Sequence, residues 1–515
     1  MALAKALSAV VVGVDSQVVE VEANVGAGLP GTFIVGLADT AIAESRDRMK
    51  TAALNSGLSW PKTKVIVSLT PASLRKSGSQ LDLAMCLAIL SAAAEDYAMR
   101  ARLRSTMLLG EVGLDGGLRE VRGVLPALLA AKAAGLSTVV LPLANAQEAQ
   151  IIDGLEVLAA ASLREAVLWA RNEAILETAS EVAEKLAPAR RTAAATRHLD
   201  MSDVVGEKEA KFAAEVAAAG AHHCMLIGPP GSGKSMIAER LPTILPPLSH
   251  SEQLEVATIR SVAPHASADP SGRPPFVAPH HSITRAALLG GGAGTPVPGA
   301  VTQAHRGVLF LDEVSEIPAQ TLDCLRTPIE EGSVRLVRSR QDVTFPASFQ
   351  LVLAANPCRC AAEEPALCTC TSRERANYLS NISGPLRDRI DIIVRTRSRG
   401  AMLAEPEVES SAAIAERVQA VRDRAAHRWE RAGFGRIPNA AMNPHVLRKR
   451  YPADEEGMGM LAAYLGNGTI SQRGCDRSLR LAWTLCDLEE AARPSLGYVS
   501  RALELRSDTE LVSAA

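Results

Sequence analysis

The stretch GPPGSGKS constrains the fold of this chain more than any other part of the sequence. It fits the pattern G-x-x-x-x-G-K-S of a phosphate-binding loop, whose glycines let backbone N–H groups turn toward phosphate oxygens. The apolar run 223–227 predicts a buried strand before the loop, and 235–240 predicts a helix after it, with an N-terminus that favours an anion. This order makes a chance glycine-rich turn the weaker interpretation. The predicted nucleotide-binding residues are Gly228, Pro229, Pro230, Gly231, Ser232, Gly233, Lys234 and Ser235.

A second apolar run, 308–311, ends in Asp312 and Glu313. In a parallel sheet such a run is a central strand that is buried on both faces. Its carboxyl end would bring Asp312 to a Mg²⁺ ion shared with Ser235, and Glu313 to the attacking water. Alone, the two acids could equally be solvated. Together with the phosphate-binding loop, they predict ATP and Mg²⁺ as cofactors.

Composition bounds the class of protein. Hydrophobic residues make up 47% of the 515 residues, which is enough for about three domains with full cores. The net charge of −2 means that any nucleic-acid contact must come from local patches, and 3% aromatic residues argue against an extended base-stacking surface. The longest apolar run, 83–94, is too short to span a bilayer, and the N-terminus shows no convincing cleavage site. We expect a cytoplasmic protein with no membrane partner.

Four of the nine cysteines are clustered as C-x-C-x7-C-x-C. They are Cys358, Cys360, Cys368 and Cys370. Four thiolates complete a closed tetrahedral zinc site, and in a cytosolic chain such a cluster favours metal over disulfides. The C-x-C spacing is tighter than the common C-x-x-C, so free thiols are the alternative, and His280 and His281 are alternative ligands. The favoured interpretation is a structural Zn²⁺ that stiffens this loop.

The chain divides into four segments by its patterns. Strands alternating with helices predict an α/β or α+β domain over residues 1–185. Residues 186–199 combine arginines, a proline and small residues without apolar periodicity, which predicts a linker. The nucleotide-binding core is expected over 200–397, and a helical unit over 398–515.

Three elements are predicted from local patterns. One helix is expected over 118–134, closed by Gly135, and another over 318–331, closed by Gly332. Two short strands around residues 339–341 predict a hairpin.

The first segment contains RKSGSQLDLAMCLAILSA and GLREVRGVLPALLAAKAAGLSTVVLPLANAQEAQII, which resemble the protease domain of Lon. Lon-type chemistry needs a serine that a lysine activates, but the matching positions hold Gln80 and Leu125. Nearby hydroxyl and amino groups fall out of register with the motif, at Lys76, Ser77 and Ser79. The resemblance implies an α+β Lon-protease-like domain that lacks the catalytic dyad and serves docking or assembly.

The motifs APHHS, GAVTQAHRGVLFLDE, LAANPCRC and SGPLRDRIDI resemble the ComM/YifB subfamily of magnesium-chelatase-like AAA+ ATPases. The resemblance runs over nearly the whole chain. It implies an α/β AAA+ P-loop core, a helix-two insertion within residues 262–299, and a C-terminal helical lid.

The activity that this resemblance implies is ATP hydrolysis in a homo-oligomer, expected to be a hexamer. The ring would act on single-stranded and branched DNA, as a helicase or branch-migration motor in recombination. One alternative is a chelatase-type motor that inserts metal into a porphyrin, and another is a regulatory scaffold with weak ATPase activity. An ATP-dependent protease is opposed by Gln80 and Leu125.

The resemblance also implies roles for single residues. Asn356 matches sensor 1, a polar group that orients water near the γ-phosphate. Arg389 matches the arginine finger that reaches a neighbouring subunit's nucleotide, with Arg387 as the alternative. Arg473 aligns with the sensor 2 arginine, with Arg477 as the alternative. The predicted catalytic residues are Glu313, Asn356, Arg389 and Arg473.

The predicted hairpin looks like the one that points into the ring's channel in related helicases. Its arginines are the expected DNA contacts: Arg335, Arg338 and Arg340. The alternative is that these side chains are solvated or pair with Glu330 and Glu331, which exposed pairs do at little energetic gain.

Overall fold

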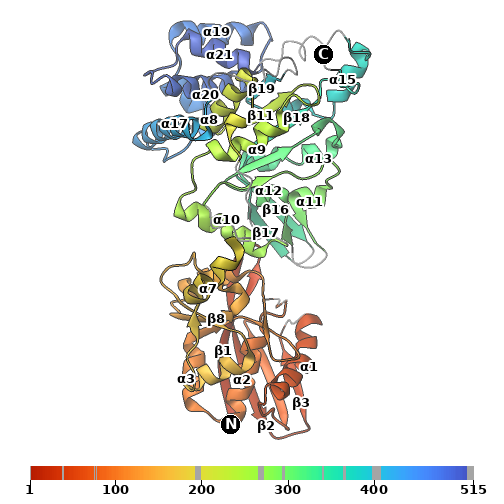
Figure 1. Cartoon of the computed structure of the whole chain (residues 1–515), viewed down its shortest axis with the longest axis vertical. Helices are drawn as coiled ribbons and strands as arrows, with labels where there is room; N and C mark the ends of the chain where they lie inside the picture. Colours follow the sequence, from red (N-terminus) through yellow and green to blue (C-terminus); the bar gives the residue numbers. More distant parts are fainter. Residues whose placement is uncertain are drawn as a thin grey trace.

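The computed structural model of the chain describes most of its residues. These are 2–36, 40–74, 76, 78–191, 199–264, 272–292, 296–338, 341–362, 367–396 and 408–506. In Figure 1 the N-terminal strands and helices lie at one end of an elongated molecule, and the C-terminal helices lie at the other. No helix within the described ranges is long and apolar enough to cross a membrane.

The N-terminal unit is built on a long hairpin. β1 (Ala2–Val12) and β2 (Asp15–Gly26) pair antiparallel. They lie in an eight-stranded mixed sheet with the order β10-β9-β8-β5-β1-β2-β4-β3. The other strands of this sheet are β3 (Gly31–Val35), β4 (Lys64–Thr70), β5 (Thr106–Leu108), β8 (Thr138–Pro142), β9 (Glu156–Ala160) and β10 (Glu177–Thr178).

Helices cover this sheet, and the most buried of them is α2 (Asp82–Ala94), whose residues 82–92 are all buried. Its apolar run is therefore a core helix. The other helices are α1 (Thr40–Asn55), α3 (Tyr97–Ser105), α4 (Val124–Ala133), α5 (Ala146–Ala149), α6 (Leu163–Ala170) and α7 (Ala179–Arg191). Because α7 continues to Arg191, the first part of the stretch predicted as a linker is helical.

The prediction of a helix over 118–134 is wrong at its N-terminal end. Residues 118–119 form β7 (Leu118–Arg119), which pairs with β6 (Glu111–Val112). The chain enters α4 only after Gly123, whose φ of 74° lies in the left-handed region. The apolar residues keep a helical spacing through this stretch, so their pattern does not reveal the short strand. The left-handed conformation of Gly123 separates that strand from the helix.

The second unit contains a five-stranded sheet with the order β12-β15-β18-β11-β19, in which all neighbours are parallel. Its strands are β12 (Phe276–Val277), β15 (Val308–Leu311), β18 (Gln350–Ala355), β11 (Cys224–Ile227) and β19 (Ile392–Arg395). Along β11, Cys224 and Leu226 join one apolar cluster, and Met225 and Ile227 join another. Both faces of the sheet are therefore covered, as the continuous apolar runs predicted.

Parallel strands place their carboxyl ends at one edge of a sheet and their amino ends at the other. At about 3.3 Å per residue, the four residues of β11 separate the two edges by roughly 13 Å. The edges therefore form two separate regions, and functional residues at one are distant from those at the other.

Helices and a hairpin surround the core sheet. The helices are α8 (Lys208–Gly220), α9 (Lys234–Ile244), α10 (His250–Val262), α11 (Arg285–Leu289), α12 (Ala300–Gln303), α13 (Ala319–Asp323) and α14 (Arg326–Glu331). The predicted hairpin is present as β16 (Ser333–Arg338) and β17 (Gln341–Pro346). The single helix expected over 318–331 is instead α13 and α14. Pro328 has no N–H to donate to the carbonyl of Cys324, so the helical ladder is interrupted there.

The C-terminal unit is helical, as predicted. Its helices are α17 (Ser411–Arg431), α18 (Pro444–Arg450), α19 (Glu455–Gly466), α20 (Gln472–Leu488) and α21 (Leu496–Arg506). Trp429 on α17 is fully buried, and its Nε1–H donates to Asn439 Oδ1 at 3.0 Å. Apolar residues of α17 and α20 belong to the same cluster as α8 and one face of the core sheet, so this unit is docked on the core.

The N-terminal unit contacts the core through α10. The backbone N–H of Gly123 donates to Ser261 O at 2.8 Å, and the N–H of Leu125 donates to Ser261 Oγ at 3.2 Å. Leu254 of α10 packs against the apolar cluster around α4. In Figure 1, α10 and the hairpin β16–β17 lie at the junction of the two units.

Candidate nucleotide-binding site

The phosphate-binding loop joins β11 to α9 at the carboxyl edge of the core sheet. Gly231 and Gly233 have φ values of 77° and 79°, which glycine adopts without strain. Lys234 is the first residue of α9, and its Nζ donates to Gly228 O at 2.7 Å. The same amino group lies 3.3 Å from the Oδ1 atom of Asn356, which directly follows β18. Two segments far apart in the sequence, the phosphate-binding loop and the end of β18, therefore meet at one cation.

Lys234 is almost fully buried. Burial lowers the pKa of this lysine, and the neighbouring carboxylates of Asp312, Glu207 and Glu313 oppose that shift. A buried cation flanked by backbone N–H groups suits a polyanion such as a nucleoside triphosphate.

The Asp-Glu pair lies beside this loop, as the two motifs together predicted. The hydroxyl of Ser235 donates to Asp312 Oδ2 at 2.7 Å, and the N–H of Glu313 donates to Asp312 Oδ1 at 2.8 Å. Hydroxyl and carboxylate oxygens are the ligands that Mg²⁺ prefers, so Ser235 and Asp312 fit a Mg²⁺ site. Glu313 has a φ of 47°, a left-handed conformation that non-glycine residues adopt at a cost and that is concentrated at functional sites.

One contact at this site was not anticipated from the sequence. His281 Nδ1 lies 2.9 Å from Glu313 Oε2. The sequence suggests only one role for His281, that of an alternative metal ligand beside the clustered cysteines. Within the described residues, the group that could hold a metal ion consists of the four cysteines and includes neither His280 nor His281. The pair is separated by 32 positions, so no local spacing could have revealed it.

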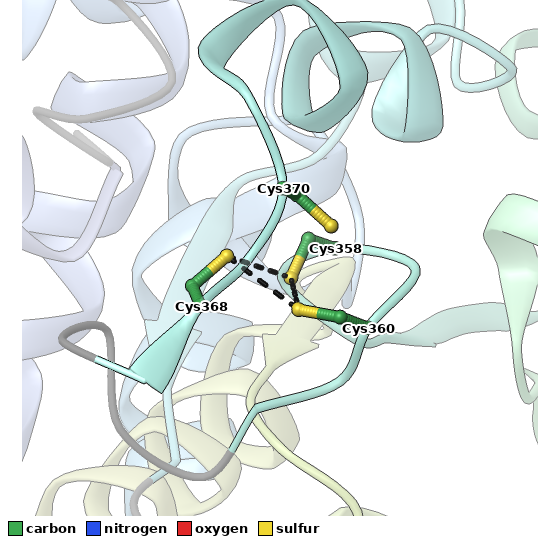
Figure 2. Close-up of side chains that lie close together, drawn as sticks. All are labelled: Cys358, Cys360, Cys368 and Cys370. Atoms are coloured by element: carbon green, nitrogen blue, oxygen red, sulfur yellow. Dashed lines mark hydrogen bonds between the residues drawn. The ribbon is translucent and has the colours of Figure 1, made fainter.

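The four cysteines come together just after Asn356 (Figure 2). Their Sγ atoms all lie within 4.8 Å of one another. The Cys358 sulfur is 3.2 Å from that of Cys360 and 3.5 Å from that of Cys368. Four sulfurs at about 2.3 Å from a tetrahedral zinc ion are about 3.8 Å apart, so the cluster fits Zn²⁺ after only small movements.

The arginines predicted to act in catalysis lie elsewhere. A cavity of about 510 Å³ is lined by Arg389, Arg473 and Arg477, together with His223 and Asp391. His223 directly precedes β11 and Asp391 directly precedes β19, so this cavity is at the amino edge of the core sheet. The phosphate-binding loop is at the opposite edge.

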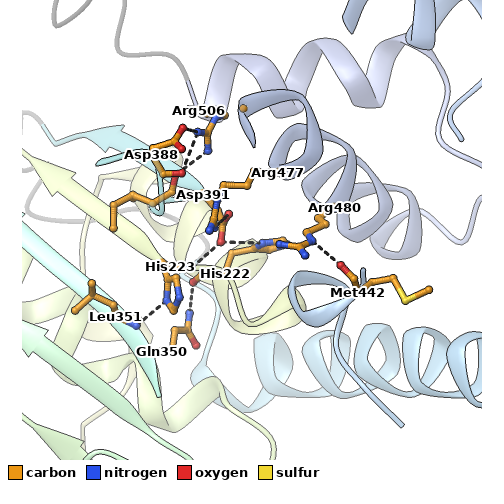
Figure 3. A network of polar contacts seen from close by, with 12 residues as sticks. His222, His223, Gln350, Leu351, Asp388, Asp391, Met442, Arg477, Arg480 and Arg506 are labelled. Atoms are coloured by element: carbon orange, nitrogen blue, oxygen red, sulfur yellow. Dashed lines mark hydrogen bonds and ion pairs between the residues drawn. The ribbon is translucent and has the colours of Figure 1, made fainter. Parts of the chain in front are cut away.

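A polar network at the amino edge fastens the C-terminal helices to the core (Figure 3). Arg477 of α20 pairs with Asp391 at 2.6 Å, and the N–H of His223 donates to the same carboxylate at 3.1 Å. Burial alone would raise the pKa of Asp391, but Arg477 and His222 hold it well below its usual range. Burial lowers the pKa of His223 to about 4. Arg477 is thus engaged in docking the helical unit.

The remaining arginines at this edge differ in accessibility. The side chain of Arg473 is 63% exposed, whereas that of Arg389 is 6% exposed and is paired with Glu330. The guanidinium of Arg387 is half-buried and makes no hydrogen bond or ion pair within the described residues.

The predicted DNA contacts are only partly described. Arg335 on β16 pairs with Asp342 on β17, with Nε donating to Oδ1 at 2.9 Å. This pairing differs from the alternative that named Glu330 and Glu331. The side chain of Arg338 and the whole of Arg340 lie outside the described residues.

A parallel sheet with a phosphate-binding loop and an Asp-Glu strand at its carboxyl edge, together with a docked helical unit, defines an AAA+-like P-loop core. The chain belongs to the ComM/YifB-type magnesium-chelatase-like proteins. Residues 200–402 match the family model described as magnesium chelatase, subunit ChlI. Residues 21–145 match the model for subunit ChlI of Mg-chelatase, and residues 408–506 match the model for the C-terminal part of that subunit.

Whole-chain relatives agree with these matches. The chain is 46% identical to an uncharacterized protein of Mycobacterium tuberculosis, over 98% of this chain and 99% of that protein. It is 35% identical to the uncharacterized protein YifB of Escherichia coli, over 97% and 96% of the two chains. It is 32% identical to the competence protein ComM of Haemophilus influenzae, over 99% of each chain.

A partial match concerns the Lon resemblance. The chain is 32% identical to Lon protease 2 of Bacillus subtilis over 147 residues, which cover 27% of each protein. This match supports the resemblance weakly, because it covers only a part of either chain.

Proposed function

We propose that this protein is an ATP-driven ring motor that acts on DNA. The convergence of Lys234, Ser235, Asp312, Glu313 and Asn356 at one sheet edge carries the proposal. In this arrangement Lys234 would neutralise the β- and γ-phosphates, Ser235 and Asp312 would hold Mg²⁺, and Glu313 and Asn356 would orient the attacking water. Bound Mg²⁺ would supply charge stabilisation during phosphoryl transfer.

The arginines support a site that is shared between subunits. Arg389 and Arg473 lie at the amino edge of the sheet, roughly 13 Å of strand away from this chain's own phosphate-binding loop. We propose that they serve the nucleotide of a neighbouring subunit, Arg389 as the finger and Arg473 as sensor 2. Arg473 is preferred to Arg477 because its side chain is 63% exposed, with Asp388 3.7 Å away. The side chain of Arg477 is 15% exposed and pairs with the buried Asp391 at 2.6 Å.

Mixing variants tests this shared site. Lys234→Ala subunits keep their arginines, and Arg389→Ala subunits keep their phosphate-binding loop. A mixture should hydrolyse more ATP than the two variants do separately, because mixed rings contain complete sites. The control mixes Lys234→Ala with Glu313→Gln, which damage the same site and should regain nothing. The same assay with Arg387→Ala decides between the two finger candidates. A mixture without gain in either case would exclude arginines acting between subunits.

The proposal also specifies a substrate, DNA, in addition to ATP hydrolysis. One whole-chain relative bears the name competence protein ComM, which favours a role in competence for this chain. On the hairpin β16–β17, Arg335 is 68% exposed, and Arg338 and Arg340 follow it in the sequence as further candidates for phosphate contact. We propose single-stranded and branched DNA as partners of a hexamer, as in branch migration.

A second candidate is favoured by the family models, which bear the name magnesium chelatase. It is a motor that drives metal insertion into a porphyrin. Measuring ATP turnover with no addition, forked DNA, a porphyrin or casein separates the candidates. Stimulation by forked DNA supports the proposal. Stimulation by porphyrin alone would replace it with the chelatase motor, and stimulation by casein would indicate proteolytic coupling.

We further propose that the four-cysteine cluster holds one structural Zn²⁺ ion. Such a closed site has no open position for chemistry, and it would stiffen the loop that follows Asn356. Cys358, Cys360, Cys368 and Cys370 would be its ligands.

We also propose that the N-terminal unit is a Lon-like domain retained for docking. Leu125, at the position matching the Lon lysine, is buried in the apolar cluster around α4, and its backbone N–H donates to Ser261 of the core. Gln80 provides no nucleophile.

A further inference from the structure

The arginine proposed as the finger is held inside its own subunit. The side chain of Arg389 is 6% exposed and forms an ion pair with Glu330, and its Nη1 donates to Pro385 O at 2.6 Å. A finger has to reach the γ-phosphate in another subunit, so Arg389 is withheld from that task in this position. We propose that Glu330 is an autoinhibitory latch, which retains Arg389 until DNA on the hairpin β16–β17 draws Glu330 away. This inference rests on the proposed ATP-driven motor, with Arg389 as its finger.

The retained position leaves the guanidinium of Arg389 incompletely paired. Its Nε is buried and has no hydrogen-bond partner among the residues that the structure describes. A buried donor without an acceptor costs free energy, which favours a second position where this N–H group is paired. Both Arg389 and Glu330 line the cavity of about 510 Å³ at the amino edge of the sheet. The two side chains therefore have room to separate.

Glu330 suits the role of a latch because it can leave the pair easily. Its side chain is 49% exposed, and Arg389 is its one ion-pair partner within the described part of the chain. An ion pair with an exposed partner contributes little to stability, because water competes for the carboxylate. A small displacement of Glu330 is therefore enough to shift the population between a retained and a released Arg389.

The hairpin is joined directly to the helix that carries Glu330. This residue lies in the last turn of α14, Gly332 follows with a φ of 64°, and β16 begins one residue later. The N–H of Ala347, which directly follows β17, donates to Gly332 O at 2.7 Å. Both strands of the hairpin therefore meet at this joint. DNA that binds the hairpin through its phosphates would displace the last turn of α14 and carry Glu330 away from Arg389.

The test compares two neighbouring glutamates in the full chain. Glu330→Ala removes the carboxylate that retains Arg389, so ATP turnover without DNA should rise about ten-fold, a usual size for an allosteric coupling, and forked DNA should add little more. Glu331→Ala is the matched control, because it removes the same charge from the next residue, which is exposed and makes no ion pair within the described residues. It should keep the wild-type turnover and the wild-type stimulation by DNA.

Two combined variants test whether the effect passes through the finger and the hairpin. Glu330→Ala with Arg389→Ala should be as slow as Arg389→Ala alone, because the gain requires the finger. Glu330→Ala added to the hairpin variant Arg338→Ala with Arg340→Ala should keep the raised turnover, because the latch is already open. A raised turnover without DNA that disappears together with Arg389 supports the inference.

The contrary outcomes are distinct from one another. Unchanged turnover in Glu330→Ala overturns the inference but leaves the proposed function intact. A gain that persists without Arg389 also overturns it, since Glu330 then acts through another group. Reduced turnover with a lowered melting temperature shows that the ion pair only supports the fold. Stimulation of Glu330→Ala by DNA to the same factor as the wild type overturns the link to the hairpin. A wild-type chain without ATP turnover overturns the proposed function itself.

Discussion

The two α/β units of this protein share a design but differ in what they bring together. In the core, the ends of parallel strands meet at one edge, where Lys234 donates to Asn356 and Ser235 donates to Asp312. In the N-terminal unit, the positions that match a Lon dyad hold Gln80 and Leu125, and Leu125 is 1% exposed. Architecture alone therefore does not carry chemistry. Function depends on the residue types that the fold brings together, and a buried leucine in α4 serves packing.

The units also depend on each other. α10 belongs to the core, yet Ser261 at its C-terminal end accepts N–H groups from Gly123 and Leu125. On its other side, Glu255 accepts from the Arg306 side chain at 2.8 Å, two residues before β15 begins. α10 is thus a physical connection between the N-terminal unit and the strand that carries the Asp-Glu pair.

The largest effect is expected from the core site itself. Lys234→Ala should abolish ATP binding, because the buried cation at the phosphates is lost. Glu313→Gln should still bind ATP but hydrolyse it at least ~10²-fold more slowly, because water positioning is a separate role. Binding of a fluorescent ATP analogue and phosphate release measure the two roles. The control is Lys449→Ala, an exposed lysine on α18. Equal loss of ATP binding in Lys234→Ala and Glu313→Gln would contradict the assignment.

The second-largest effect is expected on the zinc content when the cysteine cluster is changed. We propose no counterpart of this cluster in the N-terminal unit. The purified protein should contain one zinc per chain, and Cys358→Ser with Cys360→Ser should lose it, because two of four thiolate ligands are removed. Metal analysis of anaerobically prepared protein measures the content. Cys324→Ser, which alters a half-buried cysteine outside the cluster, should retain the metal. Wild-type protein without zinc would establish free thiols.

A substitution at Leu125 tests directly whether the N-terminal unit serves docking and not catalysis. Leu125→Lys restores the residue type of a Lon dyad, but it places a charge in a buried interface and should cost about 3–5 kcal/mol. Leu125→Met, which conserves volume, should cost less than about 1.5 kcal/mol. Thermal melting and limited proteolysis between the units measure the loss. Casein cleavage should be absent in both variants, because Gln80 supplies no nucleophile. Protease activity in Leu125→Lys would refute the docking interpretation.

The smallest effect is expected at the hairpin. Arg338→Ala with Arg340→Ala should keep basal ATPase activity but lose DNA stimulation, and the slope of log affinity against log salt should fall by about two units. Arg335→Ala should change the slope less, because Asp342 already neutralises this arginine. Filter binding at several salt concentrations measures the slopes. Unchanged affinity and slope in the double variant would locate the DNA contacts elsewhere, with the 280–285 loop and the arginines at 190–197 as the next candidates.

Local patterns predicted the site well where the relevant forces are local. The glycine spacing of the phosphate-binding loop and the apolar run before Asp312 predicted strand ends that meet at one edge. The patterns failed where a single residue interrupts a helix. The helix expected over 118–134 begins only after Gly123, and the helix expected over 318–331 is divided into α13 and α14 ahead of Pro328. Both failures concern boundaries, and neither moved a site residue.

By itself, the sequence determined the nucleotide loop, the acidic strand and the cysteine cluster, because each is written in neighbouring residues whose backbone geometry follows from residue type. Only the tertiary structure decided which distant groups meet. It placed His281 against Glu313 and buried Arg389 against Glu330. It also placed Arg473 at the edge opposite the phosphate-binding loop. These contacts depend on how strands pair and helices dock, which is set by the packing of the whole core and leaves no periodic trace in the chain.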